Sequence, residues 1–262
     1  MKSPIKYPGG KAKLVNSGIL KLPDNFNCYY EPFCGGASVF LEMINPSRHP
    51  SEISDISENL INFFQVVKYR VQELVDELKT NFYLKNNSEY YYRNRSRFNE
   101  ITNSTNPIEK AALFIYLNKT GFNGMYRENK KGEYNIPFGK MKDPVICDSG
   151  LLFKVSKKLE NTKVVCRHFT KVSPKKGDLV YLDPPYHKLF SGYTKNIFDE
   201  NQHILLYEKI KEWSSLGVYI ILSNSNTEFI QELYTTFTKI IIPIKYTVGK
   251  NRGQSEELLI TN

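Results

Sequence analysis

The sequence predicts an α/β fold built on a largely parallel sheet. Short runs of β-branched and aromatic residues alternate along the chain with stretches in which apolar residues recur at helical spacing. Alternation of this kind is typical of βαβ units, which place their strands in parallel. The chain has 262 residues, enough for one large domain or for a catalytic domain that carries an insertion.

The amino-terminal part predicts a turn and then a strand, turn and helix unit. Residues 8–11 (Pro-Gly-Gly-Lys) predict a turn, and residues 28–31 predict a short strand. A glycine-containing turn at 32–38 and an apolar stretch at 39–44 follow this strand, as they do where a strand turns into a helix. Residues 52–55 predict a second strand that ends in an acid.

The middle of the chain predicts helices and then a long loop. Apolar residues recur at helical spacing from 58 to 79, which indicates one amphipathic helix. Residues 80–119 predict two more helices, the second beginning at Pro107. Residues 120–142 contain glycines and a proline at short intervals, so we expect a hairpin or a long loop there.

The carboxy-terminal part returns to strands. A helix is predicted at 201–215, and the predicted strands are 163–166, 178–182, 218–222 and 239–244. Strand-like residues at 240–247 and 256–260 flank a short basic loop, which suggests a closing antiparallel pair.

Composition favours a polyanionic partner. The formal net charge is +9 and the pI about 9.1, and phosphates neutralised by Lys or Arg release condensed counterions. A basic surface that serves solubility alone is the alternative. The four cysteines lack metal-ligand spacing, and the sequence shows neither a signal peptide nor a run of ~20 apolar residues. We therefore expect a cytoplasmic protein with no membrane partner.

The sharpest motif is Asp183-Pro184-Pro185-Tyr186, directly after a predicted apolar strand. Two prolines in succession fix φ and remove backbone N–H donors, so the carbonyls of Asp183 and Pro184 can point into a pocket that accepts hydrogen bonds. An exocyclic amine has two hydrogens to donate, and Tyr186 could stack on the ring that carries the amine. An ordinary Pro-Pro loop is the alternative interpretation.

A second pattern indicates a nucleoside ligand. Gly35 and Gly36 follow the first predicted strand, and Asp55 ends the second strand about twenty residues later. Glycines permit close backbone approach, and an acid at this position holds ribose hydroxyls in nucleotide-binding folds. A simple strand-to-helix connection would also contain such a glycine turn.

Taken together in this order, these motifs resemble the Dam-type (alpha group) DNA adenine N6-methyltransferases. The matching segments are 7–11 (YPGGK), 31–36 (EPFCGG), 54–55 (SD), 118–127 (NKTGFNGMYR), 137–139 (PFG) and 183–186 (DPPY). The resemblance covers nearly the whole chain. It implies a Rossmann-like S-adenosylmethionine-dependent methyltransferase sheet with helices on both faces. It also implies a catalytic domain of residues 1–56 and 145–262, with residues 57–144 inserted as a helical and hairpin target-recognition domain.

The resemblance also implies a set of cofactor-binding residues. S-adenosylmethionine would be contacted by Tyr7, Lys11, Gly35, Gly36, Asp55, His168, Phe169 and Asp183. The sequence departs from the family at His168, where many members carry an acid, and at Ala37, where many carry glycine. The catalytic residues would be Asp183, Pro184, Pro185 and Tyr186. No metal is implied, because the methyl group of a sulfonium is already activated.

For DNA, the resemblance implies methylation of an adenine flipped out of double-stranded DNA, with GATC as the recognition sequence. Arg127 is the candidate base reader, since arginine can make a bidentate contact to guanine. Lys6, Asn123 and Met125 are expected beside it. A cognate restriction endonuclease is a possible partner, and we expect a monomer, with a dimer on DNA as the alternative.

Three other functions compete with this interpretation. An N4-cytosine methyltransferase faces the same exocyclic amine but usually presents serine where Asp183 stands. RNA adenine methyltransferases usually have asparagine there and lack this insertion. A catalytically silent DNA-binding module of the same fold is the third, and the intact Asp55, Asp183 and Tyr186 argue against it.

Overall fold

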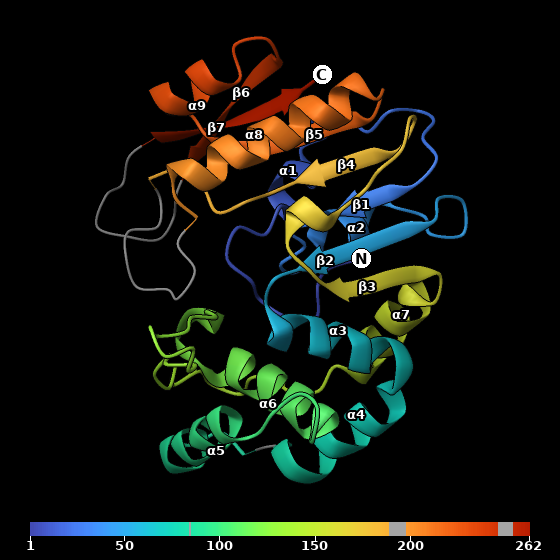
Figure 1. Cartoon of the computed structure of the whole chain (residues 1–262). Coiled ribbons are helices and arrows are strands. Elements are labelled where there is room, and N and C mark those ends of the chain that lie inside the picture. Colours follow the sequence, from blue (N-terminus) through green and yellow to red (C-terminus); the bar gives the residue numbers. More distant parts are fainter. Residues whose placement is uncertain (84, 189–197, 246–253) are drawn as a thin grey trace.

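A twisted seven-stranded sheet with the order β3-β2-β1-β4-β5-β7-β6 forms the centre of the molecule (Figure 1). The computed structural model describes residues 1–83, 85–188, 198–245 and 254–262. The strands are β1 (Tyr29–Glu31), β2 (Ser51–Asp55), β3 (Thr162–Cys166), β4 (Leu179–Leu182), β5 (Tyr219–Ser225), β6 (Thr238–Lys245) and β7 (Gln254–Thr261).

The strand directions confirm the sequence prediction. Strands β1 to β5 are parallel, and β7 runs antiparallel to both β5 and β6. The predicted closing antiparallel pair is therefore present, although its connecting loop at 246–253 lies outside the described residues. The chain reverses its strand order between β1 and β4, which is where open α/β sheets bind their ligands.

Both faces of the sheet are covered. Along β4, Leu179 and Tyr181 contribute to one apolar core while Val180 and Leu182 contribute to the other, because successive strand side chains point to opposite faces. The second core is closed by apolar residues of α8, including Trp213. The helices that flank the sheet include α1 (Ala12–Asn16), α2 (Ser38–Met43), α7 (Ser149–Leu159), α8 (Glu200–Ser215) and α9 (Glu228–Leu233).

A group of helices extends the molecule beyond the β3 edge of the sheet (Figure 1). Helix α3 (Glu58–Tyr69) packs on β2 and β3, and α6 (Pro107–Thr120) packs on α3, α4 (Val71–Glu77) and α5 (Ser88–Glu100). Helices α5 and α6 confirm the two helices predicted between 80 and 119. The assignment of 57–144 as a separate domain stays a prediction.

The prediction of one helix from 58 to 79 is wrong. The helix breaks at Arg70, whose φ of −140° is not helical, and a short π-helical segment, Leu78–Phe82, follows α4. Both α3 and α4 bury an apolar face against α6 and α7, so the apolar spacing continues across the break. The spacing of apolar residues indicates which face of a helix is buried, but it does not indicate whether the helix axis is continuous.

Residues 121–139 form the predicted hairpin-like loop, called here the recognition hairpin after the role that the sequence predicts for it. Two isolated bridges, Gly121 with Phe138 and Glu128 with Tyr134, hold its two arms together. Helix α5 supports the returning arm, because the Tyr91 hydroxyl donates to the Ile136 carbonyl at 2.9 Å. Within the described ranges, no helix has the length and apolar character needed to cross a membrane.

Candidate active site

Three carboxylates gather at one edge of the sheet. Glu31, Asp55 and Asp183 lie at or directly after the ends of β1, β2 and β4, which are parallel neighbours. The carboxyl ends of parallel strands share an edge of the sheet, and that edge is the usual ligand site of this architecture.

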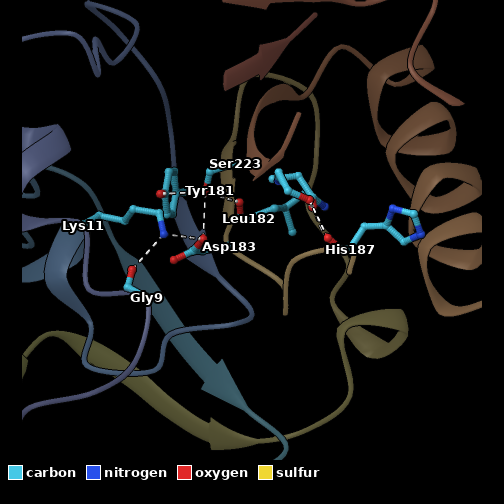
Figure 2. A network of polar contacts seen from close by, with 9 residues as sticks. Gly9, Lys11, Tyr181, Leu182, Asp183, His187 and Ser223 are labelled. Atoms are coloured by element: carbon cyan, nitrogen blue, oxygen red, sulfur yellow. Dashed lines mark hydrogen bonds and ion pairs between the residues drawn. The ribbon is translucent and has the colours of Figure 1, made fainter. Parts of the chain in front are cut away.

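Asp183 is held through one of its two oxygens (Figure 2). Its Oδ1 lies 2.8 Å from the Lys11 ammonium and accepts a hydrogen bond of 2.8 Å from the Ser223 hydroxyl. The Tyr181 hydroxyl lies 3.2 Å from the same Ser223 oxygen. Oδ2 has no hydrogen bond or ion pair in the part of the chain that the structure describes, and the Asp183 side chain is 18% exposed. One carboxylate oxygen is thus fixed while the other can accept a hydrogen.

Lys11 connects the amino-terminal loop to the Asp183 loop. Its ammonium also donates to the Gly9 carbonyl at 2.7 Å (Figure 2), and it lies 4.8 Å from the centre of the Tyr186 ring. Gly9 has a φ of +78°, a conformation that favours glycine. The Lys11 side chain is only 7% exposed, so its charge depends on these partners.

The Tyr186 ring is buried next to two carboxylates. Burial raises the pKa of Tyr186 well above its ordinary value, and the charges of Asp183 and Glu257 raise it further. Glu257, on β7, is itself buried, and burial raises its pKa against the opposing charge of Lys11. The sequence did not indicate Glu257, because it lies on a distant antiparallel strand and belongs to no motif.

The two predicted cofactor-site glycines pack against Tyr7. A Cβ placed on Gly35, whose φ is +46°, would lie 2.9 Å from the Tyr7 ring, and one placed on Gly36 would lie 3.3 Å from the Tyr7 Cβ. In this structure their small size therefore allows Tyr7 to approach. Ala37 adopts a left-handed φ of 52°, a conformation that glycine adopts more readily than alanine.

Asp55 holds the glycine turn in place. Its Oδ2 accepts a hydrogen bond of 3.2 Å from the Gly35 N–H, and its Oδ1 accepts one of 3.0 Å from the Ser57 N–H. Burial raises the pKa of Asp55, and these hydrogen bonds oppose that shift. Each carboxylate oxygen retains a further lone pair, so binding of ribose hydroxyls by Asp55 stays a prediction that this geometry allows.

The ring predicted to contact the cofactor is packed inside the protein. Phe169 is 1% exposed, while Phe33, from the segment between β1 and α2, lies 5.3 Å away between ring centres and is partly exposed. Phe198 packs edge-on against Phe33 at 5.6 Å. The His168 ring, which is also predicted to contact the cofactor, lies 2.8 Å from the Thr170 hydroxyl. Phe33 and Phe198 are thus the partly exposed phenylalanine rings beside buried Phe169, and sequence reasoning did not single out either of them.

His187 anchors the chain immediately after Tyr186. Its ring nitrogens lie 2.8 Å from the Thr227 hydroxyl and 3.0 Å from the Glu200 carboxylate. Its N–H donates to the Asn224 side chain at 3.1 Å, and its carbonyl accepts from the Ser225 hydroxyl at 2.7 Å. The loop that carries Asp183 is thus fastened to β5 and α8. No sequence motif indicated this role.

The four residues predicted to read DNA lie on the surface, and three of them belong to the recognition hairpin: Lys6, Asn123, Met125 and Arg127. The Arg127 guanidinium donates to the Asn135 side chain across the hairpin at 2.8 Å. Phe122, which sequence reasoning passed over, is 50% exposed on the same hairpin. An exposed ring beside polar and cationic side chains is typical of surfaces that stack on bases.

Glu31 is a further residue that sequence reasoning missed, although it begins the matched 31–36 segment. Its Oε2 accepts hydrogen bonds from the Tyr29 hydroxyl at 2.6 Å and from the Phe40 N–H at 3.0 Å. Burial raises the pKa of Glu31 to about 8, and the nearby charge of Asp183 contributes. Burial thus favours the protonated form of this carboxyl in the folded protein.

We expect Glu31→Gln to remove a pH-dependent loss of stability. Between the ordinary pKa of 4.5 and the folded pKa of about 8, the folded state binds more protons, so the free energy of unfolding falls as pH rises. Across this window we expect the free energy of unfolding of the wild type to fall by on the order of 3–5 kcal/mol. The variant, which has no carboxyl at this position, should not show this decrease. Urea unfolding from pH 5 to 9 measures it, and identical pH dependence of the two proteins would refute the assignment.

Comparison with known families identifies the class of the chain. Residues 7–248 match the D12 class N6 adenine-specific DNA methyltransferases. The chain belongs to this family. Its seven-stranded sheet with flanking helices is consistent with the methyltransferase fold that the sequence predicted, and the predicted adenine-specific DNA methyltransferase activity is confirmed as the class of this enzyme.

Full-length relatives agree with the family match. The chain is 35% identical to the type II methyltransferase M.MjaIII of Methanocaldococcus jannaschii, with 98% of both chains covered. It is 34% identical to the type II methyltransferase M1.LlaDCHI of Lactococcus lactis, over 98% of this chain and 94% of that one. It is 31% identical to the DNA adenine methylase of Escherichia coli K12, over 97% of this chain and 91% of that one.

Proposed function

We propose that this methyltransferase transfers the methyl group of S-adenosylmethionine to the N6 amine of an adenine flipped out of double-stranded DNA, with GATC as the recognition sequence. The observation that carries the proposal is Asp183 at the carboxyl end of β4, with Oδ1 held by Lys11 and Ser223. A carboxylate fixed through one oxygen presents the other in a defined direction, as an amine hydrogen requires.

The residues at the sheet edge fit S-adenosylmethionine. That cofactor carries a sulfonium and an ammonium, a carboxylate, ribose hydroxyls and an adenine ring. The edge offers matching groups: the carboxylates of Asp55 and Asp183, the ammonium of Lys11 and the accessible ring of Phe33. When bound, the cofactor supplies a methyl group that is already activated, so the proposal requires no metal.

The protein's part in the reaction is to hold and orient the amine. Asp183 Oδ2 and the Pro184 carbonyl would accept its two hydrogens, which directs the nitrogen lone pair toward the methyl group. Tyr186 would stack on the base and offset part of the few kcal/mol that unstacking costs. As the bond from N6 to the methyl carbon forms and the sulfur–methyl bond breaks, with S-adenosylhomocysteine as the leaving group, the amine would gain positive charge next to the Asp183 carboxylate. A proton would then leave to water.

Binding of S-adenosylmethionine tests the cofactor assignment and separates an enzyme from a silent DNA-binding module. We expect calorimetric titration of the protein with S-adenosylmethionine to reach saturation with one molecule per chain. A protein that only binds DNA has no need of this cofactor. A titration that shows no binding at millimolar cofactor would contradict the proposal.

For DNA, we propose that residues 57–144 act as the target-recognition domain and that the recognition hairpin reads the site. The exposure of Arg127 and Phe122 on that hairpin and the net charge of +9 support this. Two relatives carry the name type II methyltransferase, which supports a cognate restriction endonuclease as a partner. A monomeric active unit stays a prediction.

We expect Arg127→Ala to relax specificity. One bidentate guanine contact contributes ~1–3 kcal/mol of discrimination, so kcat/KM at the preferred site should fall by roughly 5- to 150-fold, with a smaller change at sites lacking that guanine. The matched control is Arg48→Ala, which removes the same charge from an exposed position in the loop before β2. Equal losses on every sequence would make Arg127 a phosphate contact instead.

A further inference from the structure

Asn118, at the last turn of α6, joins two segments that are far apart in the sequence. Its Oδ1 accepts a hydrogen bond of 2.8 Å from the Lys6 N–H, and its Nδ2 donates to the Lys6 carbonyl at 2.7 Å. The same Nδ2 donates to the Gly124 carbonyl at 3.0 Å. The side chain is 2% exposed, so both of its polar atoms depend on these backbone partners.

The two segments held by Asn118 also touch each other. Gly124 has a φ of +65°, and a Cβ placed on it would collide with the Lys6 side chain and lie 3.2 Å from the Asn118 carbonyl. Glycine is therefore required at 124 both for the backbone conformation and for the approach of Lys6. The start of the recognition hairpin and the amino-terminal loop form one packed unit.

The amino-terminal loop continues from this junction into the active site. Tyr7, the residue after Lys6, packs on Gly35 and Gly36. Lys11 then forms the ion pair with Asp183. On the other side of the junction, Arg127 follows Gly124 by three positions on the recognition hairpin. Contacts between neighbouring segments thus connect Arg127, the candidate base reader, through the amino-terminal loop to the Asp183 carboxylate.

We propose that Asn118 is a positioning residue that couples DNA recognition to the cofactor and catalytic site by fixing the amino-terminal loop to the recognition hairpin. The inference rests on the proposed function. Contact of the hairpin with its DNA site would order the Lys6 end of the loop, and thereby Tyr7 and Lys11 at its other end. Coupling between two ligands is reciprocal, so DNA that the enzyme recognises should tighten binding of the cofactor.

Asn118→Asp separates this role from simple packing. The aspartate keeps the shape and the acceptor for the Lys6 N–H, but it replaces the donor with an oxygen that faces the Lys6 and Gly124 carbonyls. The matched control is Asn99→Asp. Asn99, on α5, also makes a reciprocal pair of hydrogen bonds with the hairpin backbone, at Tyr134, but none of these reaches the amino-terminal loop. Gly124→Ala disturbs the same junction from the hairpin side.

The test measures the dissociation constant of S-adenosylhomocysteine, which has no methyl group to transfer, with and without a duplex that the wild type methylates. We expect the duplex to tighten binding at least ~5-fold in the wild type and in Asn99→Asp, and less than ~2-fold in Asn118→Asp and Gly124→Ala. Thermal unfolding identifies any variant that does not fold. If Asn118→Asp or Gly124→Ala fails to fold, the other of these two variants provides the test of coupling.

The outcomes distinguish the inference from the function on which it rests. A folded Asn118→Asp or Gly124→Ala with the wild-type ratio would overturn the coupling role, as would an equal loss of the ratio in Asn99→Asp. A wild type that methylates DNA without any effect of DNA on the dissociation constant would also overturn it and leave the proposed function intact. A wild type that binds no cofactor and transfers no methyl group would instead refute the proposed function.

Discussion

Replacing Asp183 with asparagine is expected to lower kcat for methyl transfer by roughly three orders of magnitude, because the site loses the carboxylate that meets the charge developing on the amine. An asparagine can still accept the Ser223 hydrogen bond, so the loop geometry is retained. Pre-steady-state transfer of labelled methyl to duplex DNA measures the chemical step directly.

The choice of asparagine follows from the structure. The ion pair with buried Lys11 shows that alanine would leave an ammonium without its partner, which is costly in a buried site. Stability measurements on Asp183→Ala are therefore expected to show a loss in addition to the loss of activity.

Asp178→Asn is the matched control for Asp183→Asn. Asp178 directly precedes β4, at the opposite end of the same strand, and is also buried. Its carboxylate accepts hydrogen bonds from the Cys28 N–H at 3.0 Å and the Lys175 N–H at 2.7 Å. We expect this variant to lower stability and to leave kcat of the folded protein near the wild-type value. Near-normal turnover by Asp183→Asn would contradict the catalytic assignment.

Lys11→Met is expected to have the second-largest effect. Methionine retains most of the side-chain volume but removes the ion pair to Asp183, the hydrogen bond to the Gly9 carbonyl and the cation over the Tyr186 ring. Of the two contacts that hold Asp183 Oδ1, the variant keeps the hydrogen bond from Ser223 and loses the ion pair with Lys11. Misplacement of a catalytic group by about 1 Å can cost 10²-fold, so we expect a decrease in kcat of roughly 10²-fold.

Lys209→Met is the control for Lys11→Met. Lys209 pairs with Glu212 at 2.6 Å on the surface of α8, and such exposed pairs contribute at most ~1 kcal/mol. We expect it to change neither kcat nor the midpoint of urea unfolding by a measurable amount. If Lys11→Met behaved in the same way, the ion pair with Asp183 would have no part in positioning the carboxylate.

Much of the fold could be predicted from local patterns. The alternation of strands and helices gave the parallel sheet, and the residues around 249–253 separated the two strands of the closing antiparallel pair. The break at Arg70 could not be predicted, because the residues on both sides bury the same kind of apolar stripe and no proline or glycine marks the position.

The candidate site was predictable where a residue belongs to a motif. Asp183, Lys11 and Asp55 were indicated by their motifs, but the ion pair that joins Lys11 to Asp183 was not, because it bridges distant parts of the chain. Ser223 and Glu257 carry no local signal, and the arrangement of β4, β5 and β7 brings them to the site. His187 directly follows the motif, but its hydrogen bond to Asn224 joins parts of the chain that no motif connects. Sequence thus indicates the reacting groups more readily than the residues that position them.

The most direct test of the account is transfer of labelled methyl from S-adenosylmethionine to three duplexes, followed by nucleoside analysis. One duplex contains GATC, one contains a scrambled site, and one contains only G and C. We expect N6-methyladenine on the GATC duplex and none on the other two. Methyladenine at another site would discard GATC alone, whereas methylcytosine, or DNA binding with no methyl transfer, would contradict the central claim that Asp183 serves adenine methylation.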